Sequence, residues 1–319
     1  MMRSLLIYLS KAAWARRIVT RWSFAWRAAS RFVAGEKLED AIRVIGVLNA
    51  KGINATLDHL GEHTYNLADA QRATQDVLEM IAAIDQAKVR ANVSVKLTQL
   101  GMAVDKEVCA ENLTTILKKA REYSSFVRFD MEDSPWVDAT LDLYRKMRLD
   151  GFDNVGVAIQ SYLFRSEEDI RQLSLQGTRV RLCKGAYKEP AHIAFPKKRA
   201  VDANYDLLIE MLIDCSKKFD SPVTGLDGKI PPIPAVASHD PKRIEHAKEY
   251  AQNVSLPQNA LEFQMLYGIR RDLQEQLAIE GYPVRIYVPF GTEWYPYYVR
   301  RLAERPANVW FFISNFFRK

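Results

Sequence analysis

Cysteine is scarce in this chain, and long hydrophobic runs are absent. The three cysteines, Cys109, Cys183 and Cys215, are widely spaced and form no C-x-x-C pair, so the sequence predicts neither a disulfide framework nor a structural zinc site. Lys11 and Arg16 interrupt the N-terminal apolar segment well short of the roughly 18 to 20 residues that a membrane-spanning helix requires. These absences indicate a reducing compartment and an N-terminal segment that does not cross a bilayer.

Metal-binding and dinucleotide-binding patterns are missing as well. Among the five histidines, the one close cluster joins His59 and His63 to Asp58 and Glu62, and no H-E-x-x-H or comparable ligand spacing accompanies it. We therefore expect no metal centre. No G-x-G-x-x-G turn follows the first predicted strand, which argues against an open dinucleotide-binding sheet.

The charge is distributed unevenly. The chain of 319 residues is 48% apolar and 26% charged, which is ordinary for a globular protein, and its net charge is +6. Residues 1–31 contain seven basic residues and no acidic one, which leaves a net charge of −1 for the rest of the chain. A nearly neutral body does not predict nucleic-acid binding.

The basic N-terminal arm has an amphipathic pattern. Trp14, Ile18, Trp22 and Trp26 recur every four residues and would share one face of a helix. Such a helix is typical of segments that lie on a membrane surface. A transit peptide has a similar composition, and packing on the body or on another subunit is a third alternative. We divide the chain into a basic amphipathic helical arm, 1–35, and a larger domain, 36–319.

Short β-rich runs alternate with amphipathic stretches after this arm. The runs predict eight strands, at 53–59, 92–97, 126–131, 155–160, 179–184, 235–238, 260–265 and 284–288. Helices are expected between them, at 66–91, 105–123, 134–149, 166–176, 198–219, 240–251 and 269–280, with start signals at Ser134, Ser166 and Asp240. Alternation of strands and helices requires a parallel sheet. Eight such units predict an α/β fold of the (βα)8, TIM-like barrel type, preceded by N-terminal helices.

Polar residues gather where these strands end, and a barrel carries its chemistry at the carboxyl ends of its strands. They are Asp58, His59, Lys96, Asp130, Glu132, Gln160, Arg181, Lys184, Ser238, His239, Glu262, Gln264 and Tyr287. A single member of this set could be structural, because buried charges in a barrel often neutralise each other. A complete ring of polar residues favours an active site.

A pair of arginines follows the eighth strand on a predicted helix. Arg300 and Arg301 share overlapping helix faces with Tyr297 before them and Glu304 after them. Two adjacent guanidinium groups are suited to binding a carboxylate or a phosphate. Their position beside the predicted barrel mouth favours a role in the site over that of an ordinary solvated helix face.

Eight segments resemble the motifs of the proline dehydrogenase family in order and spacing. They are Val93–Leu97 (VSVKL), Arg128–Glu132 (RFDME), Val157–Gln160 (VAIQ), Val180–Tyr187 (VRLCKGAY), Ala237–His239 (ASH), Leu261–Gln264 (LEFQ), Arg285–Pro289 (RIYVP) and Tyr298–Glu304 (YVRRLAE). The resemblance covers about residues 36–310 and is to the short, single-function bacterial type.

This resemblance implies a distorted barrel whose last helix lies over the mouth. It also implies non-covalently bound FAD and oxidation of L-proline to Δ1-pyrroline-5-carboxylate by hydride transfer to flavin N5. A membrane quinone would accept the electrons, and the arm would contact the membrane. The implied location is the cytoplasm, peripherally at the inner membrane, or the mitochondrion if the arm is a transit peptide. Whether the chain forms a homo-oligomer is left open.

The resemblance also implies roles for individual residues. Asp130 and Arg181 are expected to be catalytic. The implied substrate-binding residues are Lys96, Tyr187, Leu266, Tyr287, Arg300 and Arg301. The implied cofactor-binding residues are Met131, Gln160, Arg181, Lys184, Gly185, Ala186, Ser238, His239 and Glu304.

Three positions depart from the family pattern, and two other functions stay open at this point. Lys188, Ser238 and Asp240 stand where an aromatic residue, Thr and Asn are usual, which affects the expected cofactor side. A barrel lyase or aldolase would form a Schiff base at Lys96 or Lys184. A non-enzymatic protein would use the arm to bind anionic membranes or nucleic acid.

Overall fold

Eight parallel strands form a closed barrel in chain order, with β8 hydrogen-bonded to β1. The computed structural model describes residues 12, 14, 19, 23–61 and 64–304, without the side chains of residues 23, 24, 303 and 304. The strands are β1 (Asn54–His59), β2 (Ala91–Val95), β3 (Val127–Phe129), β4 (Val155–Gln160), β5 (Val180–Cys183), β6 (Pro234–Ala237), β7 (Glu262–Leu266) and β8 (Val284–Phe290). The predicted barrel is confirmed, and each predicted strand end lies within two residues of the observed one.

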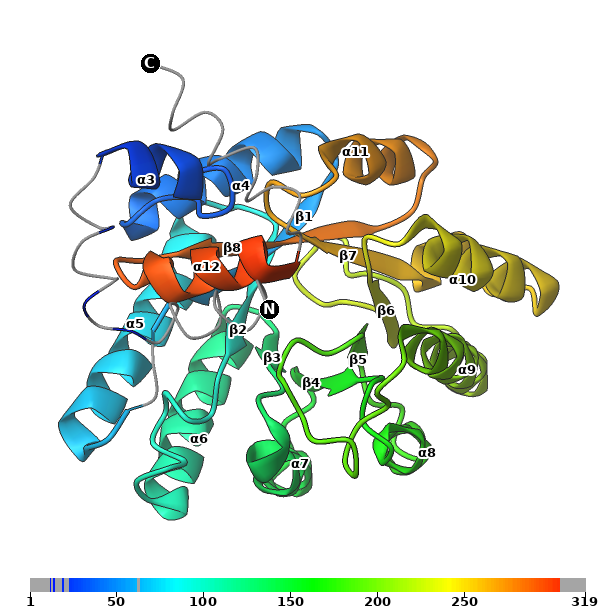
Figure 1. The fold of residues 1–319 in the computed structure, drawn as a ribbon, viewed down its shortest axis with the longest axis horizontal. Helices are drawn as coiled ribbons and strands as arrows, with labels where there is room; N and C mark the ends of the chain where they lie inside the picture. The colour runs from blue at the N-terminus through cyan, green and yellow to red at the C-terminus, as the bar shows by residue number, and fades with distance from the viewer. Residues whose placement is uncertain (1–11, 13, 15–18, 20–22, 62–63, 305–319) are drawn as a thin grey trace.

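Helices surround the barrel and connect consecutive strands (Figure 1). They are α3 (Ser23–Ala29), α4 (Leu38–Ala50), α5 (Leu67–Gln86), α6 (Lys106–Glu122), α7 (Val137–Leu149), α8 (Ser166–Ser174), α9 (Lys198–Lys218), α10 (Pro241–Asn253), α11 (Arg271–Ile279) and α12 (Trp294–Glu304), with single 3-10 turns η1 (Ser134–Trp136) and η2 (Gln258–Ala260). The parallel strands can follow one another round the barrel because each intervening helix returns the chain to the same end.

Helix starts follow the expected signals in part. The Asp240 side chain accepts a hydrogen bond from the Lys242 amide at 3.2 Å, with Pro241 in the first turn of α10. The predicted caps at Ser134 and Ser166 are wrong, because both hydroxyls donate elsewhere. Ser166 is the first residue of α8, the helix that it was expected to precede, and its hydroxyl donates to the Leu163 carbonyl at 2.7 Å. Ser134 donates to Glu189 at 2.6 Å.

Side chains alternate along each strand between the helix layer and the barrel interior. In β1, Ala55 and Leu57 are fully buried in the apolar layer shared with the helices. Thr56 lies between them and faces the interior, where its hydroxyl donates to the Asn92 side chain on the neighbouring strand β2 at 2.6 Å. The apolar layer supplies most of the buried hydrophobic surface, so the interior is free to carry polar groups.

A buried arginine fills part of that interior. Arg128 on β3 is 1% exposed, and its guanidinium donates to the carbonyls of Val157 and Arg179 and lies 4.9 Å from the centroid of the Phe126 ring. The space exists because the neighbouring residue on β4 is Gly156. A Cβ atom there would lie 2.8 Å from the Arg128 guanidinium and would also collide with the Arg179 carbonyl.

The loop before β6 closes the amino-terminal end of the barrel. The carbonyl oxygen of Gly228 accepts from Arg285 at 2.8 Å, and that of Lys229 accepts from Asn92 at 2.7 Å. The Lys229 side chain, in turn, donates to the Tyr123 carbonyl at 2.9 Å. This loop therefore forms a floor that is bonded to side chains of β2 and β8. The opposite end of the barrel is the mouth.

Helices α3 and α12 pack against each other in a second, smaller apolar cluster that also contains Leu60 at the end of β1. The ring centroids of Trp26 and Trp294 are 5.4 Å apart, and those of Phe32 and Tyr298 are 6.3 Å apart. In Figure 1, α12 crosses the barrel near β1 and β8. Within the described ranges, no helix is long and apolar enough to span a membrane.

Gly156→Ala is expected to lower the free energy of unfolding by about 1–3 kcal/mol, because the added Cβ overpacks the interior around Arg128. The matched control is Gly46→Ala in α4, where an added Cβ meets no atom within 4 Å. We expect this control to stabilise the protein by about 0.5–1 kcal/mol through its helix propensity. Urea unfolding of both variants tests this expectation. Equal free energies of unfolding for Gly156→Ala and Gly46→Ala would contradict overpacking at residue 156.

Candidate active site

Five of the residues predicted at the strand ends meet in two bonded groups at the mouth. Glu262 was also predicted there but lies deeper, because it is the first residue of β7. The first group joins β1 to the end of β2: Lys96 Nζ lies 2.6 Å from Asp58 Oδ1, and the Asp58 side chain is 2% exposed. Burial alone would lower the pKa of Lys96, but the carboxylates of Asp58 and Asp130 outweigh it and raise that pKa. Lys96 is therefore a permanent cation at neutral pH.

The second group is centred on Asp130, just after β3. Its Oδ1 accepts from Arg181 NH1 at 2.6 Å, and its Oδ2 accepts from the Tyr287 hydroxyl at 2.7 Å. The Arg181 guanidinium also lies 5.2 Å from the centroid of the Tyr287 ring. Burial and the Asp130 carboxylate hold the pKa of Tyr287 well above its ordinary value, so its hydroxyl remains a donor. Three strands thus fix these side chains relative to one another.

The arginine pair lies on α12, the helix that follows β8. Tyr187 is 37% exposed, but loss of solvent around its hydroxyl raises its pKa to about 12, and the positive charges of Lys96 and Arg300 act against that increase. Likewise, burial raises the pKa of Cys183 to about 11, with Arg301 among the groups that oppose it. Both arginines therefore lie within electrostatic reach of residues that follow or end β5.

The predicted cofactor residues lie beside this cluster, on the ends of β3 to β6. Met131, Gln160 and Ser238 are buried, and Gln160 Nε2 donates to the Met131 carbonyl at 3.2 Å. Lys184 Nζ lies 2.5 Å from Asp202 and 2.8 Å from Asp240.

Leu266 and His239 are joined by a backbone hydrogen bond. The Leu266 amide donates to His239 Nε2 at 3.0 Å, so this ring nitrogen is unprotonated. The described part of Glu304 is its backbone in α12, and its predicted flavin contact lies outside the described side chains.

Two features of this region suit a flavin dinucleotide. Gln160 Oε1 is buried without a hydrogen-bond partner among the described residues, so an acceptor is available for a ligand donor. Gly185 has φ +113°, and its α-carbon lies so close to the Tyr162 ring that a Cβ would collide with it. Glycine at 185 thus lets this loop pack on Tyr162 beside the unpartnered Gln160 oxygen, and the residues present fit the group.

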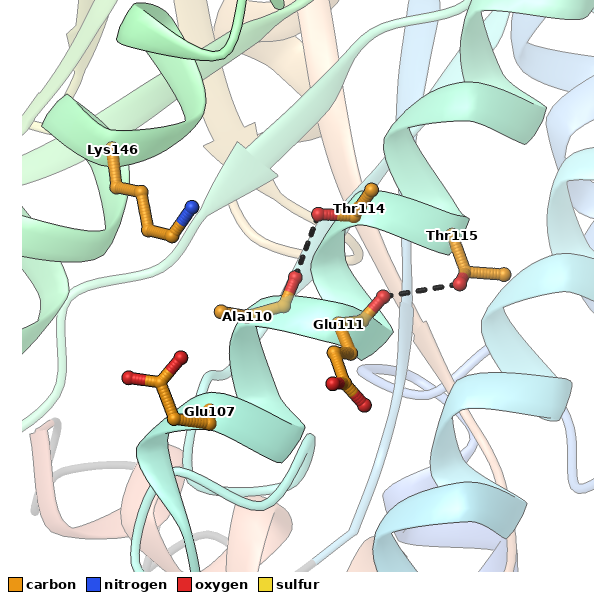
Figure 2. A pocket seen from close by; sticks show the side chains of 6 residues that line it. All are labelled: Glu107, Ala110, Glu111, Thr114, Thr115 and Lys146. Carbon is orange, nitrogen blue, oxygen red and sulfur yellow. Dashed lines mark hydrogen bonds between the residues drawn. The ribbon is translucent and has the colours of Figure 1, made fainter.

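Two other places in the described part of the chain carry polar side chains close together. His59 Nδ1 lies 3.1 Å from Asp76, whereas Glu62 and His63 lie outside the described residues, and no group of three or more metal-ligating side chains occurs among the described ones. Figure 2 shows a hollow on the outer wall between α6 and α7. It is lined by Glu107, Ala110, Glu111, Thr114, Thr115 and Lys146. It lies away from the strand ends, so it shares no chemistry with the mouth.

Sequence reasoning missed three interior residues: Ser94, Arg128 and Arg285. Each is followed two positions later by a residue of the predicted ring, namely Lys96, Asp130 and Tyr287. Residues at i and i+2 on a strand share one face. The spacing Arg-x-Asp and Arg-x-Tyr was thus a usable signal that a second polar layer lies beneath the mouth.

A closed (βα)8 barrel that carries polar and charged side chains at its strand ends has the architecture of a barrel enzyme, and adjacent arginines are suited to binding an anion. A model of the proline dehydrogenase family matches residues 41–313. The chain is 37% identical to Proline dehydrogenase 1 of Bacillus subtilis over 100% of both proteins. It is also 39% identical to the Proline dehydrogenase of Deinococcus radiodurans, over 91% of this chain and 90% of that protein.

A solved structure agrees with this assignment. Proline utilization A (PutA) from Bdellovibrio bacteriovorus, inactivated by N-propargylglycine, superimposes with a TM-score of 0.77 at 27% identity. The match covers 88% of this chain and 33% of PutA, so this chain spans about a third of that protein. The chain belongs to the proline dehydrogenase family of oxidoreductases. The predicted family, fold and enzyme class are confirmed.

Lys96→Met is expected to lower the free energy of unfolding by about 3–5 kcal/mol at pH 8, because it leaves the Asp58 carboxylate buried without its cation. Burial raises the pKa of Asp58 above its unfolded value. A raised carboxyl pKa gives stability that is complete below the unfolded pKa and is lost as the pH rises through the folded pKa. The deficit relative to wild type should therefore shrink toward pH 5. Denaturant unfolding across this range tests it.

The control is Lys96→Met combined with Asp58→Asn, which removes both charges. We expect this double variant to recover part of the lost stability and to show little pH dependence. A deficit in Lys96→Met that stayed constant from pH 5 to pH 8 would contradict the assignment of the effect to Asp58.

Proposed function

We propose that this protein oxidises L-proline to Δ1-pyrroline-5-carboxylate with non-covalently bound FAD and passes the electrons to a membrane quinone. The observation that carries the proposal is the mouth itself. There Lys96 pairs with Asp58 at 2.6 Å, Asp130 binds both Arg181 and Tyr287, and the arginine pair lies on the helix that follows β8. Membership of the proline dehydrogenase family supplies the substrate class.

The carboxylate of proline would be held by Lys96, Arg300 and Arg301. Arg300 is exposed at the mouth, and Arg301 is partly buried, with its guanidinium 5.1 Å from the centroid of the Tyr297 ring. Cations on α12 and on the opposite strand end would fix the carboxylate from two sides. Holding a reactant in near-attack geometry can lower a barrier by several kcal/mol.

The ring of proline would lie between Tyr187, Tyr287 and Leu266. Because the Tyr287 hydroxyl is held by Asp130 at 2.7 Å, its position is fixed and would limit the room for ring substituents. Asp130 and Arg181 are the proposed catalytic residues: Asp130 organises the charge cluster, and Arg181 presents its guanidinium to the flavin. The positive groups around the ligand would also favour the neutral amine, whose lone pair assists departure of a hydride from the adjacent carbon.

FAD, when bound, supplies the acceptor for that hydride. The residues that would hold it are Met131, Gln160, Arg181, Lys184, Gly185, Ala186, Ser238 and His239, with Glu304 retained from the family resemblance. Gln160 offers its unpartnered Oε1, and Gly185 lets the loop that carries Lys184 and Ala186 pack on the Tyr162 ring. The Lys184 ammonium is held by Asp202 and Asp240, so it would meet the cofactor from a fixed position.

A Schiff-base lyase is less well supported by this geometry. A Schiff base requires a neutral amine, whereas the pKa of Lys96 is raised by its carboxylate neighbours. Lys184 is bonded to two carboxylates at 2.5 and 2.8 Å. Neither lysine has the desolvated, unpaired surroundings that activate an amine.

The first test is a visible spectrum of the purified protein, followed by anaerobic addition of L-proline. We expect flavin bands that bleach with L-proline and persist with L-alanine, which lacks the ring. A flavin that stays oxidised after addition of L-proline would overturn the assignment of L-proline as the substrate. A colourless protein that takes up no added FAD would overturn the assignment of FAD as the cofactor.

The arm is proposed to hold the protein on the cytoplasmic side of the inner membrane, near the quinone. Residues 25–33 contribute to the cluster with α12, and Ala12 and Val19 pack against it. The truncation that tests the arm therefore removes residues 1–22, which spares the buried members of the cluster. We expect this truncation to weaken sedimentation with anionic liposomes while activity with a soluble dye is retained. Unchanged sedimentation would contradict membrane contact through the arm.

A further inference from the structure

A line of hydrogen-bonded side chains runs through the barrel from its floor to its mouth. Arg285 near the floor binds Glu262, with contacts of 3.0 and 3.2 Å from Nε and 3.0 Å from NH2. Glu262 Oε1 accepts from Gln264 Nε2 at 2.6 Å, and Gln264 Oε1 accepts from Arg181 Nε at 2.6 Å. The line thus ends at the guanidinium that binds Asp130.

Glu262 decides which way the Gln264 amide points. An amide side chain has one end that donates and one that accepts. The Glu262 carboxylate only accepts, so the Gln264 NH2 group turns toward it and the oxygen turns toward Arg181. The opposite orientation would place two donors against each other at Arg181 and two acceptors against each other at Glu262. Both side chains are almost completely buried, so no water is at hand to relieve that mismatch.

Arg285 prevents Glu262 from moving. Its guanidinium uses its other donors on the Ala55 carbonyl at 2.9 Å and the Gly228 carbonyl at 2.8 Å. Arg285 is 1% exposed and Glu262 is 0% exposed. The carboxylate is therefore pinned by a cation that is itself bonded to the barrel wall and the floor.

Arg181 has one acceptor for each of its three nitrogens. Nε donates to Gln264, NH1 donates to Asp130, and NH2 donates to Ser94 at 3.0 Å. These acceptors come from three different strands or strand ends, so the planar guanidinium has a single position that satisfies all of them. Loss of the Gln264 acceptor would leave the plane free to rotate about the remaining two contacts.

We propose that Glu262 is a positioning residue for the oxidation, acting through Gln264 to hold the Arg181 guanidinium in place. Glu262 lies beneath the site and touches neither Arg181 nor Asp130 by a hydrogen bond of its own. The inference rests on the proposed function in so far as Arg181 is taken to face the flavin. The placement of Arg181 by Gln264 is independent of any bound cofactor.

The main variant is Gln264→Met, which keeps the side-chain volume and leaves the Glu262–Arg285 pair intact. We expect kcat for L-proline to fall about tenfold or more, because a small displacement of an oriented group is costly, while KM changes little because the carboxylate is held elsewhere. The flavin midpoint potential should shift downward as the Arg181 cation loses its fixed position. The control is Thr56→Val, which breaks the buried Thr56–Asn92 hydrogen bond in the same interior.

A double-mutant cycle tests the part played by Glu262. Glu262→Gln should lower kcat in the wild-type background and should have no further effect on kcat in the Gln264→Met background. Additive effects would overturn action through Gln264. Glu262→Gln could fail to fold because Arg285 loses its partner. In that case the comparison of Gln264→Met with Thr56→Val still tests the proposal. Equal kcat values and equal midpoint potentials in these two variants would overturn it.

A measurement on the protein without flavin separates this proposal from the proposed function. The Arg181 charge acts to lower the pKa of Cys183, which burial raises to about 11. Displacement of Arg181 in Gln264→Met should therefore slow the alkylation of Cys183 at pH 8 to 9. The rate is measured by mass spectrometry of the peptide that contains Cys183. Thr56→Val should leave this rate unchanged. An unchanged rate would overturn the positioning claim even if L-proline reduces the flavin normally.

Discussion

A closed barrel leaves its inward side chains to solvate one another, and this constraint shapes the whole site. The interior carries the cations Lys96, Arg128, Arg181 and Arg285 and the anions Asp58, Asp130 and Glu262. Three ion pairs account for all except Arg128, whose guanidinium turns to two carbonyl oxygens and an aromatic face. Glu132, which is also buried and accepts from the Thr98 hydroxyl at 2.6 Å, adds a fourth anion, so these buried cations and anions are equal in number.

The same constraint explains why side chains at the mouth are held by more than one contact. Two of the three carboxylates that neutralise a cation also bond a second group: Asp130 holds Tyr287 as well as Arg181, and Glu262 holds Gln264 as well as Arg285. Charge balance and orientation are therefore supplied by the same contacts. Replacing one member would disturb both, so effects of substitutions within this network are not expected to add.

Much of the architecture could be predicted from local pattern, because β-rich runs and amphipathic stretches depend on neighbours in the chain. The strand-end residues followed from that pattern, and Lys96, Asp130, Arg181 and Tyr287 do meet. Partners distant in sequence could not be predicted. Nothing local indicates that Lys184 binds Asp202, that Ser134 binds Glu189 instead of capping its helix, or that Arg128 depends on the absent side chain of Gly156.

The two ends of the barrel are held by different kinds of contact. The Gly228–Lys229 loop is bonded to polar strand side chains across the amino-terminal end. The helix that follows β8, α12, packs on α3 through aromatic rings instead. The position of the helix that carries Arg300 and Arg301 is therefore coupled to a segment that precedes the first strand of the barrel.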